Sequence, residues 1–158
     1  MSELTHIDKD GNAVMVDVTA KDETVRVAKA ACSVLMSPDT VAAISDARIK
    51  KGDVLSIAQL AGIMGAKKTA DLIPLCHPLP LTSSQVELVI NVERNGIDIV
   101  STCKITGRTG VEMEALTAVS VAALTVYDMC KAIDRAIRIT DIRLIHKSGG
   151  KSGTYDAA

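Results

Sequence analysis

The sequence predicts a single α+β domain in which helices cover one face of an antiparallel sheet. Two runs of alternating apolar and polar residues flank Asn95-Gly96, and such a pair between alternating runs is a strong hairpin signal. The chain has 158 residues, of which 47% are hydrophobic, so it suits one domain with a substantial core. The predicted order is strand, two helices, hairpin, long helix and strand. This order is typical of a ferredoxin-like layer.

The first half of the chain is expected to form a strand and two helices. Apolar side chains over residues 24–36 favour a strand, although intervening alanines weaken the pattern. Ser37-Pro38 supplies an N-cap and a first helical position, so a helix is expected over residues 39–47. Apolar residues recur at helical spacing over residues 53–68 and predict a second helix. The proline-bracketed segment 74–80 cannot continue it.

The second half is expected to contribute the hairpin, a long helix and a final strand. Residues alternate between apolar and mostly polar over 85–92 and again over 97–105. Small and apolar residues over about 111–134 predict one long helix, and alternation returns over 138–147. A small sheet with its second face open leaves apolar side chains exposed, so association between copies of the chain is also expected.

One domain spanning residues 1–158 is expected, with flexible segments at both ends. Residues 1–14 are polar, and residues 149–158 are rich in Gly, Ser and Lys, which favours a flexible tail or an ordered loop over a ligand. The N-terminus lacks an apolar signal region. The longest uncharged apolar runs have thirteen residues, fewer than the about 20 that span a membrane. We therefore expect a cytoplasmic protein with no membrane partner.

The composition argues against nucleic acid and metal ions as ligands. The chain has no Trp or Phe, two Tyr and a formal net charge of -1, so it lacks the aromatic platforms and the positive charge of nucleic-acid readers. Its four cysteines are far apart and form no CxxC pair, whereas structural zinc sites show closely spaced ligands. Reduced, mostly buried thiols are expected, and no metal site is predicted.

The long helix carries the first candidate acid and base. Asp128 interrupts a run that is otherwise mostly apolar or small, so it is expected to lie on a dry face, where a carboxylate is costly unless it is paired or used. Lys131 follows at i+3 and can change the protonation of Asp128. Glu114 lies fourteen residues earlier, close to four helical turns, and projects from nearly the same side. The alternative is a solvated structural ion pair.

Three other segments supply an imidazole and further cations. Lys51 precedes the second helix, and the N-terminus of a helix favours anions. Three prolines stiffen the loop that carries His77, which suits a positioned proton donor or a phosphate ligand. Lys147 and Lys151 lie in a glycine-rich segment whose backbone can approach an anion. Each segment also has a structural explanation: solvated lysines, a hydrogen-bonded histidine or a polar tail.

Together these groups indicate a site for a polyphosphorylated small molecule on which protons are moved, since cations hold phosphates while carboxylates and an imidazole act as acid and base. The residues alone do not identify that molecule. The strings DLIPLCHPL, RTGVEMEALTAVSVAALTVYDMCKA and KSGGKSG resemble those of the molybdenum cofactor biosynthesis protein C family, the cyclic pyranopterin monophosphate synthases. The similarity runs from about residue 4 to residue 153.

The resemblance implies a ferredoxin-like subunit that assembles as a homohexamer of three dimers, with the active site at the dimer interface. It implies a pyrophosphate-releasing lyase of molybdenum cofactor biosynthesis. The substrate would be 3',8-cyclo-7,8-dihydroguanosine triphosphate, a cyclised GTP derivative, and the product cyclic pyranopterin monophosphate. No cofactor is implied as required, and Mg²⁺ can accompany the triphosphate.

The resemblance also assigns roles to individual residues. Asp128 matches the catalytic aspartate and Lys131 its acid or base partner, with the direction of proton transfer left open. Lys51 and Lys147 match further active-site lysines. The implied substrate-binding residues are Leu75, Cys76, His77, Glu112, Met113, Glu114 and Arg26.

Two rival functions fit some of the same residues. A metal-dependent nucleotide cyclohydrolase would use Cys76, His77 and another thiol around zinc. A nucleotide-sensing regulator with a ferredoxin-like fold would use Asp128 as a structural residue and would have no turnover.

Overall fold

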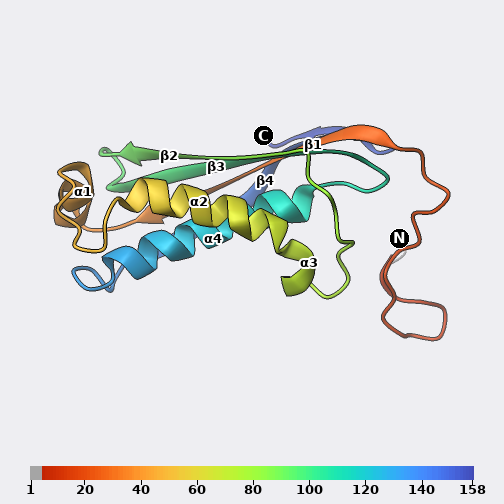
Figure 1. Ribbon diagram of the computed structural model, residues 1–158, viewed down its shortest axis with the longest axis horizontal. Coiled ribbons are helices and arrows are strands. Elements are labelled where there is room, and N and C mark those ends of the chain that lie inside the picture. Colours follow the sequence, from red (N-terminus) through yellow and green to blue (C-terminus); the bar gives the residue numbers. More distant parts are fainter. Residues whose placement is uncertain (1–4) are drawn as a thin grey trace.

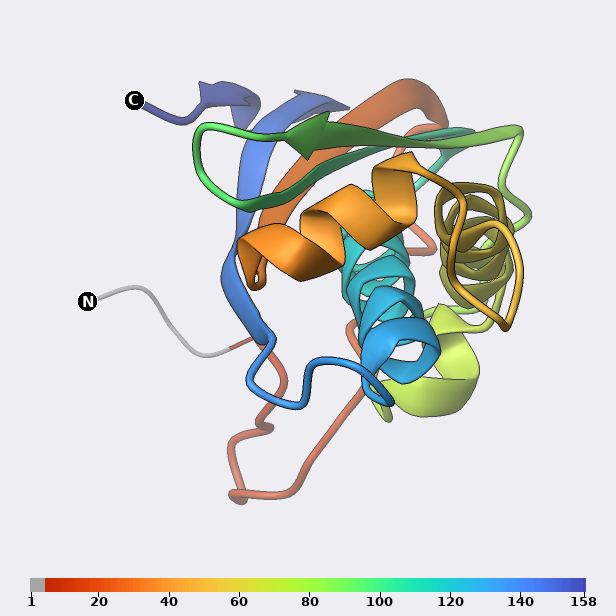
Figure 2. The ribbon, with the colours of Figure 1, turned by 90° about the vertical axis from the view of Figure 1, so that its left-hand side faces the viewer.

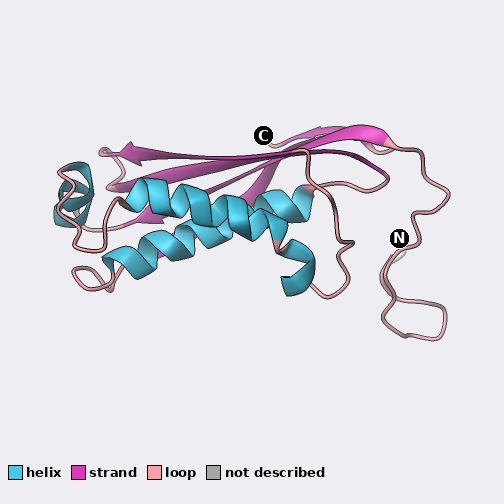
Figure 3. Ribbon diagram, in the orientation of Figure 1, coloured by secondary structure: helices cyan, strands magenta, loops and turns pink. Residues whose placement is uncertain are grey.

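The protein folds as a five-stranded antiparallel sheet with its helices on one face, an α+β ferredoxin-like arrangement (Figures 1 and 3). The computed structural model describes residues 5–158. The strands are β1 (Thr24–Leu35), β2 (Ser83–Asn91), β3 (Gly96–Gly107), β4 (Arg138–Gly150) and β5 (Gly153–Asp156), in the spatial order β2-β3-β1-β4-β5. The helices are α1 (Pro38–Ser45), α2 (Val54–Lys67), α3 (Thr69–Leu72) and α4 (Glu112–Cys130).

Helix α4 is the centre of the core, because it packs against both the sheet and α2 (Figures 1 and 2). Its inward residues are mostly alanines and valines that are fully buried, among them Ala118 and Ala122. A Cβ atom added at Gly62 of α2 would lie 2.9 Å from the carbonyl oxygen of Ala118. Only glycine therefore allows this close approach of α2 to α4. The close packing fixes the position of α4, which carries functional groups at both of its ends.

The predicted strands and helices are confirmed, with boundaries that differ by a few residues. The largest difference is the end of α4, which stops at Cys130 rather than near residue 134. The Asp134 carboxylate instead accepts hydrogen bonds from the Ser37 backbone N–H, at 2.8 Å, and from the Thr40 hydroxyl, at 3.1 Å. This contact ties the residue before α1 to the chain that follows α4.

Both chain ends contain secondary structure in the described part of the chain. Residues 153–156 of the predicted flexible tail form strand β5, which pairs with β4. At the other end, a bridge between Ile7 and Ala13 closes a turn in which Asp8 accepts hydrogen bonds from backbone N–H groups. Residues 1–4 of the predicted N-terminal lead lie outside the described part. Main-chain pairing and turn contacts form these structures. Such contacts leave no apolar pattern in the sequence from which they could be predicted.

Within residues 5–158, α4 is the one helix long and apolar enough to cross a membrane by length and composition. Half of its apolar window is buried inside the fold. Its packing between α2 and the sheet is that of a core helix.

Candidate functional site

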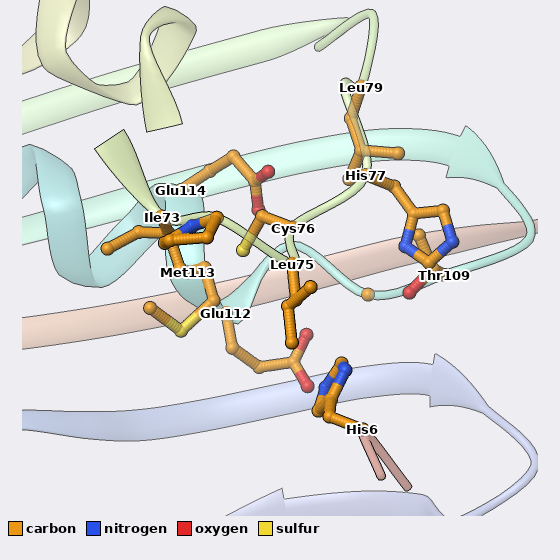
Figure 4. A pocket seen from close by; sticks show the side chains of 12 residues that line it. His6, Ile73, Leu75, Cys76, His77, Leu79, Thr109, Glu112, Met113 and Glu114 are labelled. Atoms are coloured by element: carbon orange, nitrogen blue, oxygen red, sulfur yellow. The ribbon is translucent and has the colours of Figure 1, made fainter. Parts of the chain in front are cut away.

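Two neighbouring cavities meet at the start of α4. The first, of about 490 Å³, is bounded by the proline-rich loop after α3 and by the first turn of α4 (Figure 4). The second, of about 510 Å³, is bounded by the start of β1 and the turn between β4 and β5. Thr109, Gly110 and Glu112 line both cavities and form their common wall.

The first cavity combines apolar walls with two imidazoles and two carboxyl groups. Its lining residues are His6, Ile73, Pro74, Leu75, Cys76, His77, Leu79, Thr109, Gly110, Glu112, Met113 and Glu114. The His77 ring is held by a contact of 2.7 Å between Nε2 and the carbonyl oxygen of Val16. Nε2 is therefore the nitrogen that carries the proton in this contact, because a carbonyl oxygen only accepts.

Glu114 is the buried carboxyl group of this cavity, and its side chain lies beside Cys76 (Figure 4). Burial raises the pKa of Glu114 to about 7, its own backbone N–H opposes the shift, and the nearby Glu112 charge adds to it. Burial, with the charges of Glu114 and Glu112, also raises the pKa of the Cys76 thiol. A carboxyl group with a pKa near neutrality can both release and accept a proton at working pH.

The second cavity is cationic. It is lined by Lys21, Asp22, Thr24, Arg26, Thr109, Gly110, Glu112, Lys147, Gly149, Gly150, Lys151 and Ser152. Arg26 is buried and is held in place by its Nε donating to the carbonyl oxygen of Gly107 at 2.9 Å. Lys147 donates to Glu112 in the common wall, and both side chains are mostly buried. Fixed cations beside a wall that also borders the first cavity suit a phosphate chain attached to a ring system.

Glycine is required where the backbone of β4 passes β1. Gly149 has φ +94°, and a Cβ atom there would overlap the carbonyl oxygen of Val25. The Thr24 hydroxyl donates to the Gly149 carbonyl at 2.6 Å. The close approach places the backbone of this glycine-rich segment on the floor of the cationic cavity.

A third group of charged residues lies where α4 ends. Asp128 accepts from Lys131 Nζ at 2.7 Å and from Lys51 Nζ at 2.9 Å, and Lys51 also donates to the Asp128 carbonyl at 2.7 Å. These contacts, the one with Lys131 first, lower the pKa of Asp128 to about 2, and Asp128 in turn raises the pKa of Lys131. The resting pair is therefore a carboxylate and an ammonium.

The predicted burial of Asp128 is wrong. Its side chain is 58% exposed, and Leu124, one turn earlier on the same face, is 59% exposed. Some of the apolar residues near Asp128 in the sequence therefore lie on a face of α4 that the rest of the chain does not cover. The buried carboxylate of the helix is Glu114, of which only 4% is exposed.

Within a single chain, the predicted site residues form two groups, one at each end of α4. Asp128, Lys131 and Lys51 lie where α4 ends. Figure 1 shows this end of α4 on the same side of the molecule as α1. The other group lies where α4 begins, and the fourteen residues from Glu114 to Asp128 span about 21 Å along a helix axis. The second group comprises Arg26, Leu75, Cys76, His77, Glu112, Met113, Glu114 and Lys147.

The lining residues that sequence reasoning missed include an imidazole and a lysine. His6 borders the first cavity and Lys21 the second. Both belong to the segment before β1, which has no periodic pattern. Its position is set by long-range contacts such as Arg108 Nη1 donating to the Thr19 carbonyl at 3.1 Å.

The zinc alternative has no ligand set in one chain. Within residues 5–158, no three His, Cys, Asp or Glu side chains gather closely enough to hold a metal ion. Cys32, Cys103 and Cys130 are buried free thiols whose pKa values burial raises. Such thiols are poor metal ligands, because the thiolate is the ligating form.

Comparisons with known proteins agree with the resemblance seen in the sequence motifs. Residues 15–150 match the model of the MoaC family. A cyclic pyranopterin monophosphate synthase of Rhodospirillum rubrum is 65% identical over 155 residues, covering 98% of this chain and 93% of that protein. A protein of the same name from Dinoroseobacter shibae is 62% identical, and the alignment covers 99% of each chain. Another from Heliobacterium modesticaldum is 57% identical, with 98% of each chain covered. The chain belongs to the MoaC family.

Proposed function

We propose that this protein is a cyclic pyranopterin monophosphate synthase, a lyase of molybdenum cofactor biosynthesis. It converts the cyclised GTP derivative into cyclic pyranopterin monophosphate and pyrophosphate. The observation that carries the proposal is the common wall at Glu112, which separates a cavity with acid and base groups from a cationic cavity. A substrate with a ring system and a triphosphate chain fits both at once. The names of the relatives support the same activity.

The first cavity would hold the ring system during the proton transfers. Glu114, with its pKa near 7, is suited to giving and taking protons there. His77 and the side chain of Met113 line the same cavity and would fix the ring. The apolar walls exclude water, which strengthens each polar contact with the substrate.

The second cavity would hold the phosphates. Closure of the cyclic phosphate requires a substrate hydroxyl oxygen to bond to the innermost phosphorus while the bond to the leaving pyrophosphate breaks. Arg26 and Lys147 would stabilise the charge that develops on the leaving group. Lys147, held by Glu112, is positioned for this before substrate arrives. The proposal requires no cofactor, and Mg²⁺ can accompany the triphosphate.

The third group would supply a second proton donor. Because Asp128 rests as a carboxylate beside protonated Lys131, we assign Lys131 as the first proton donor and Asp128 as the group that stabilises it. Lys51 would stabilise negative charge near the same atoms.

The residues at the start of α4 and those at its end would come together between two chains of an assembly. The Lys51, Asp128 and Lys131 side chains are each about half exposed, and the face beside them carries exposed Leu124. We propose that a second copy brings its own first and second cavities against this end of α4, within a homohexamer of three dimers. The net charge of -1 fits a small-molecule enzyme of the cytoplasm without a nucleic-acid partner.

The direct test of the function uses purified protein and enzymatically prepared cyclised GTP substrate. We expect pyrophosphate release together with a product that oxidises to a fluorescent pterin. GTP itself, which lacks the extra ring closure, is the negative control and should yield neither signal. Folded protein that leaves authentic substrate unchanged would refute the synthase function and favour the nucleotide-sensing alternative.

The shared site predicts complementation between two inactive variants. Lys131→Ala removes the group at the end of α4, and Glu114→Gln removes the acid at its start. If each site draws one group from each chain, random pairing of equal amounts restores about a quarter of wild-type activity. Subunits would be unfolded and refolded together, and each variant refolded alone is the control. A mixture that stays as inactive as its components would show that one chain supplies both groups.

A further inference from the structure

The hairpin of β4 and β5 extends past the part of the chain that matches the family model. That match ends at residue 150, whereas β5 covers Gly153–Asp156. In the register of the hairpin, Tyr155 lies opposite Lys147, and Asp156 lies opposite His146. Strand β5 thus pairs directly with the backbone that carries a lysine of the cationic cavity.

Little burial holds β5 in place. All four of its residues are exposed, and a short two-stranded hairpin is marginally stable by itself. The side-chain contact that ties β5 to β4 joins His146 Nδ1 to Asp156 Oδ1 at 2.7 Å. On its other side the same ring contacts the Ser148 hydroxyl through Nε2 at 3.3 Å. The imidazole therefore links β5 to the strand segment on either side of Lys147.

The turn of this hairpin forms a wall of the cationic cavity. Lys151 and Ser152 occupy the turn between β4 and β5, and both line the cavity. Neither His146 nor Asp156 is among the lining residues. Any effect of these two residues on a bound phosphate chain must therefore pass through the position of the hairpin.

We propose that His146 and Asp156 are positioning residues that clamp β5 onto β4 and so hold the Lys151–Ser152 turn and Lys147 against the phosphate chain of the substrate. The inference rests on the proposed function for the identity of that substrate. The clamp acts on binding of the phosphates, because the groups assigned to proton transfer lie in the first cavity and at the end of α4. It is expected to change KM more than kcat.

The test compares Asp156→Ala with Asp156→Asn and with the control Asp71→Ala. Asp71 is an exposed aspartate that is paired with Lys68 and lines neither cavity. We expect Asp156→Ala to raise KM and the Kd for inorganic tripolyphosphate about fivefold, the effect of losing one exposed charged contact. The value of kcat should stay within about twofold of wild type. Asp156→Asn should recover most of the affinity, because its amide oxygen still accepts from Nδ1–H.

Trypsin supplies a readout that is independent of turnover. A loosened hairpin exposes the bond after Lys151, so Asp156→Ala should be cut there faster than wild type and Asp71→Ala. Unchanged KM, tripolyphosphate affinity and cleavage rate in folded Asp156→Ala would overturn the clamp, and so would a loss confined to kcat. If the wild-type protein forms no product, the proposed function fails, while calorimetry with tripolyphosphate and the cleavage rates still decide the clamp.

Discussion

Replacement of Lys131 by alanine is expected to abolish product formation while leaving the fold and the assembly intact. Lys131 is 51% exposed, so its removal leaves no cavity in the core. Loss of a proton donor in the transition state typically lowers the rate by about 10²–10⁴-fold. The measurement is single-turnover pterin formation at saturating substrate, with light scattering to verify the assembly.

A matched control exists for the Lys131 prediction. Lys68 forms an i,i+3 ion pair with Asp71 that resembles the pair of Lys131 with Asp128 but lies outside both groups of site residues. Lys68→Ala should keep normal turnover. Lys131→Arg retains the charge but is a poor proton donor, since arginine stays protonated, so it should remain nearly inactive. Near-normal turnover of Lys131→Ala would contradict its assigned role.

Replacement of Glu114 by glutamine is expected to lower turnover and to raise the free energy of unfolding above neutral pH. The pKa of Glu114 is about 7 in the folded protein and 4.5 in the unfolded chain, so the folded state binds the proton more tightly. Stability contributed by this group is present below pH 4.5 and is lost as pH rises toward 7. The loss amounts to about 3 kcal/mol once the carboxyl group is ionised. Glutamine cannot ionise, so the variant should avoid this loss.

Urea unfolding at several pH values measures this effect. At pH 8 we expect the glutamine variant to be more stable than wild type by up to about 3 kcal/mol, and at pH 4 the two should nearly coincide. Turnover should fall by about 10²-fold or more, because the amide cannot transfer a proton. Asp128→Asn is the contrast: Asp128 has a lowered pKa, so its ionised form stabilises the fold, and its removal brings no gain at pH 8. Identical pH profiles for wild type and Glu114→Gln would show that folding does not raise the pKa of Glu114.

The strands and helices could be predicted from local patterns in the sequence, because each pattern depends on the chemistry of neighbouring residues. The Asn95-Gly96 pair predicted a hairpin, and β2 and β3 form it, with Asn95 at φ +51° in the turn. Ser37 caps α1 by accepting from the Thr40 backbone N–H, as its position before Pro38 predicted. The hairpin and the start of the helix could both be predicted, since each depends on three or four consecutive residues.

Burial of the charged groups could not be predicted in the same way. Asp128 and Glu114 stand in similar apolar surroundings in the sequence, yet the first is open to solvent and the second is buried. The difference arises because α2 and the sheet cover only part of α4, and Leu124 shows that an apolar neighbour need not be covered. The sequence spacing placed the two residues about four helical turns apart, and the motif resemblance assigned both to one site, but neither indicated that one chain keeps them in separate groups.

The contact between Asp134 and Ser37 also restricts the loop that carries Lys51. Asp134 ties the start of α1 to the chain that leaves α4, and the Asp53 cap, accepting from the Ser56 backbone N–H, starts α2. Residues 46–53 therefore connect two anchored helices, and the conformational entropy of this connection is largely removed during folding. The loop from which Lys51 contacts Asp128 therefore has little conformational entropy in the folded state. In the proposed function, substrate binding would require less ordering at this end of α4, and a larger share of the binding free energy would remain for the chemical step.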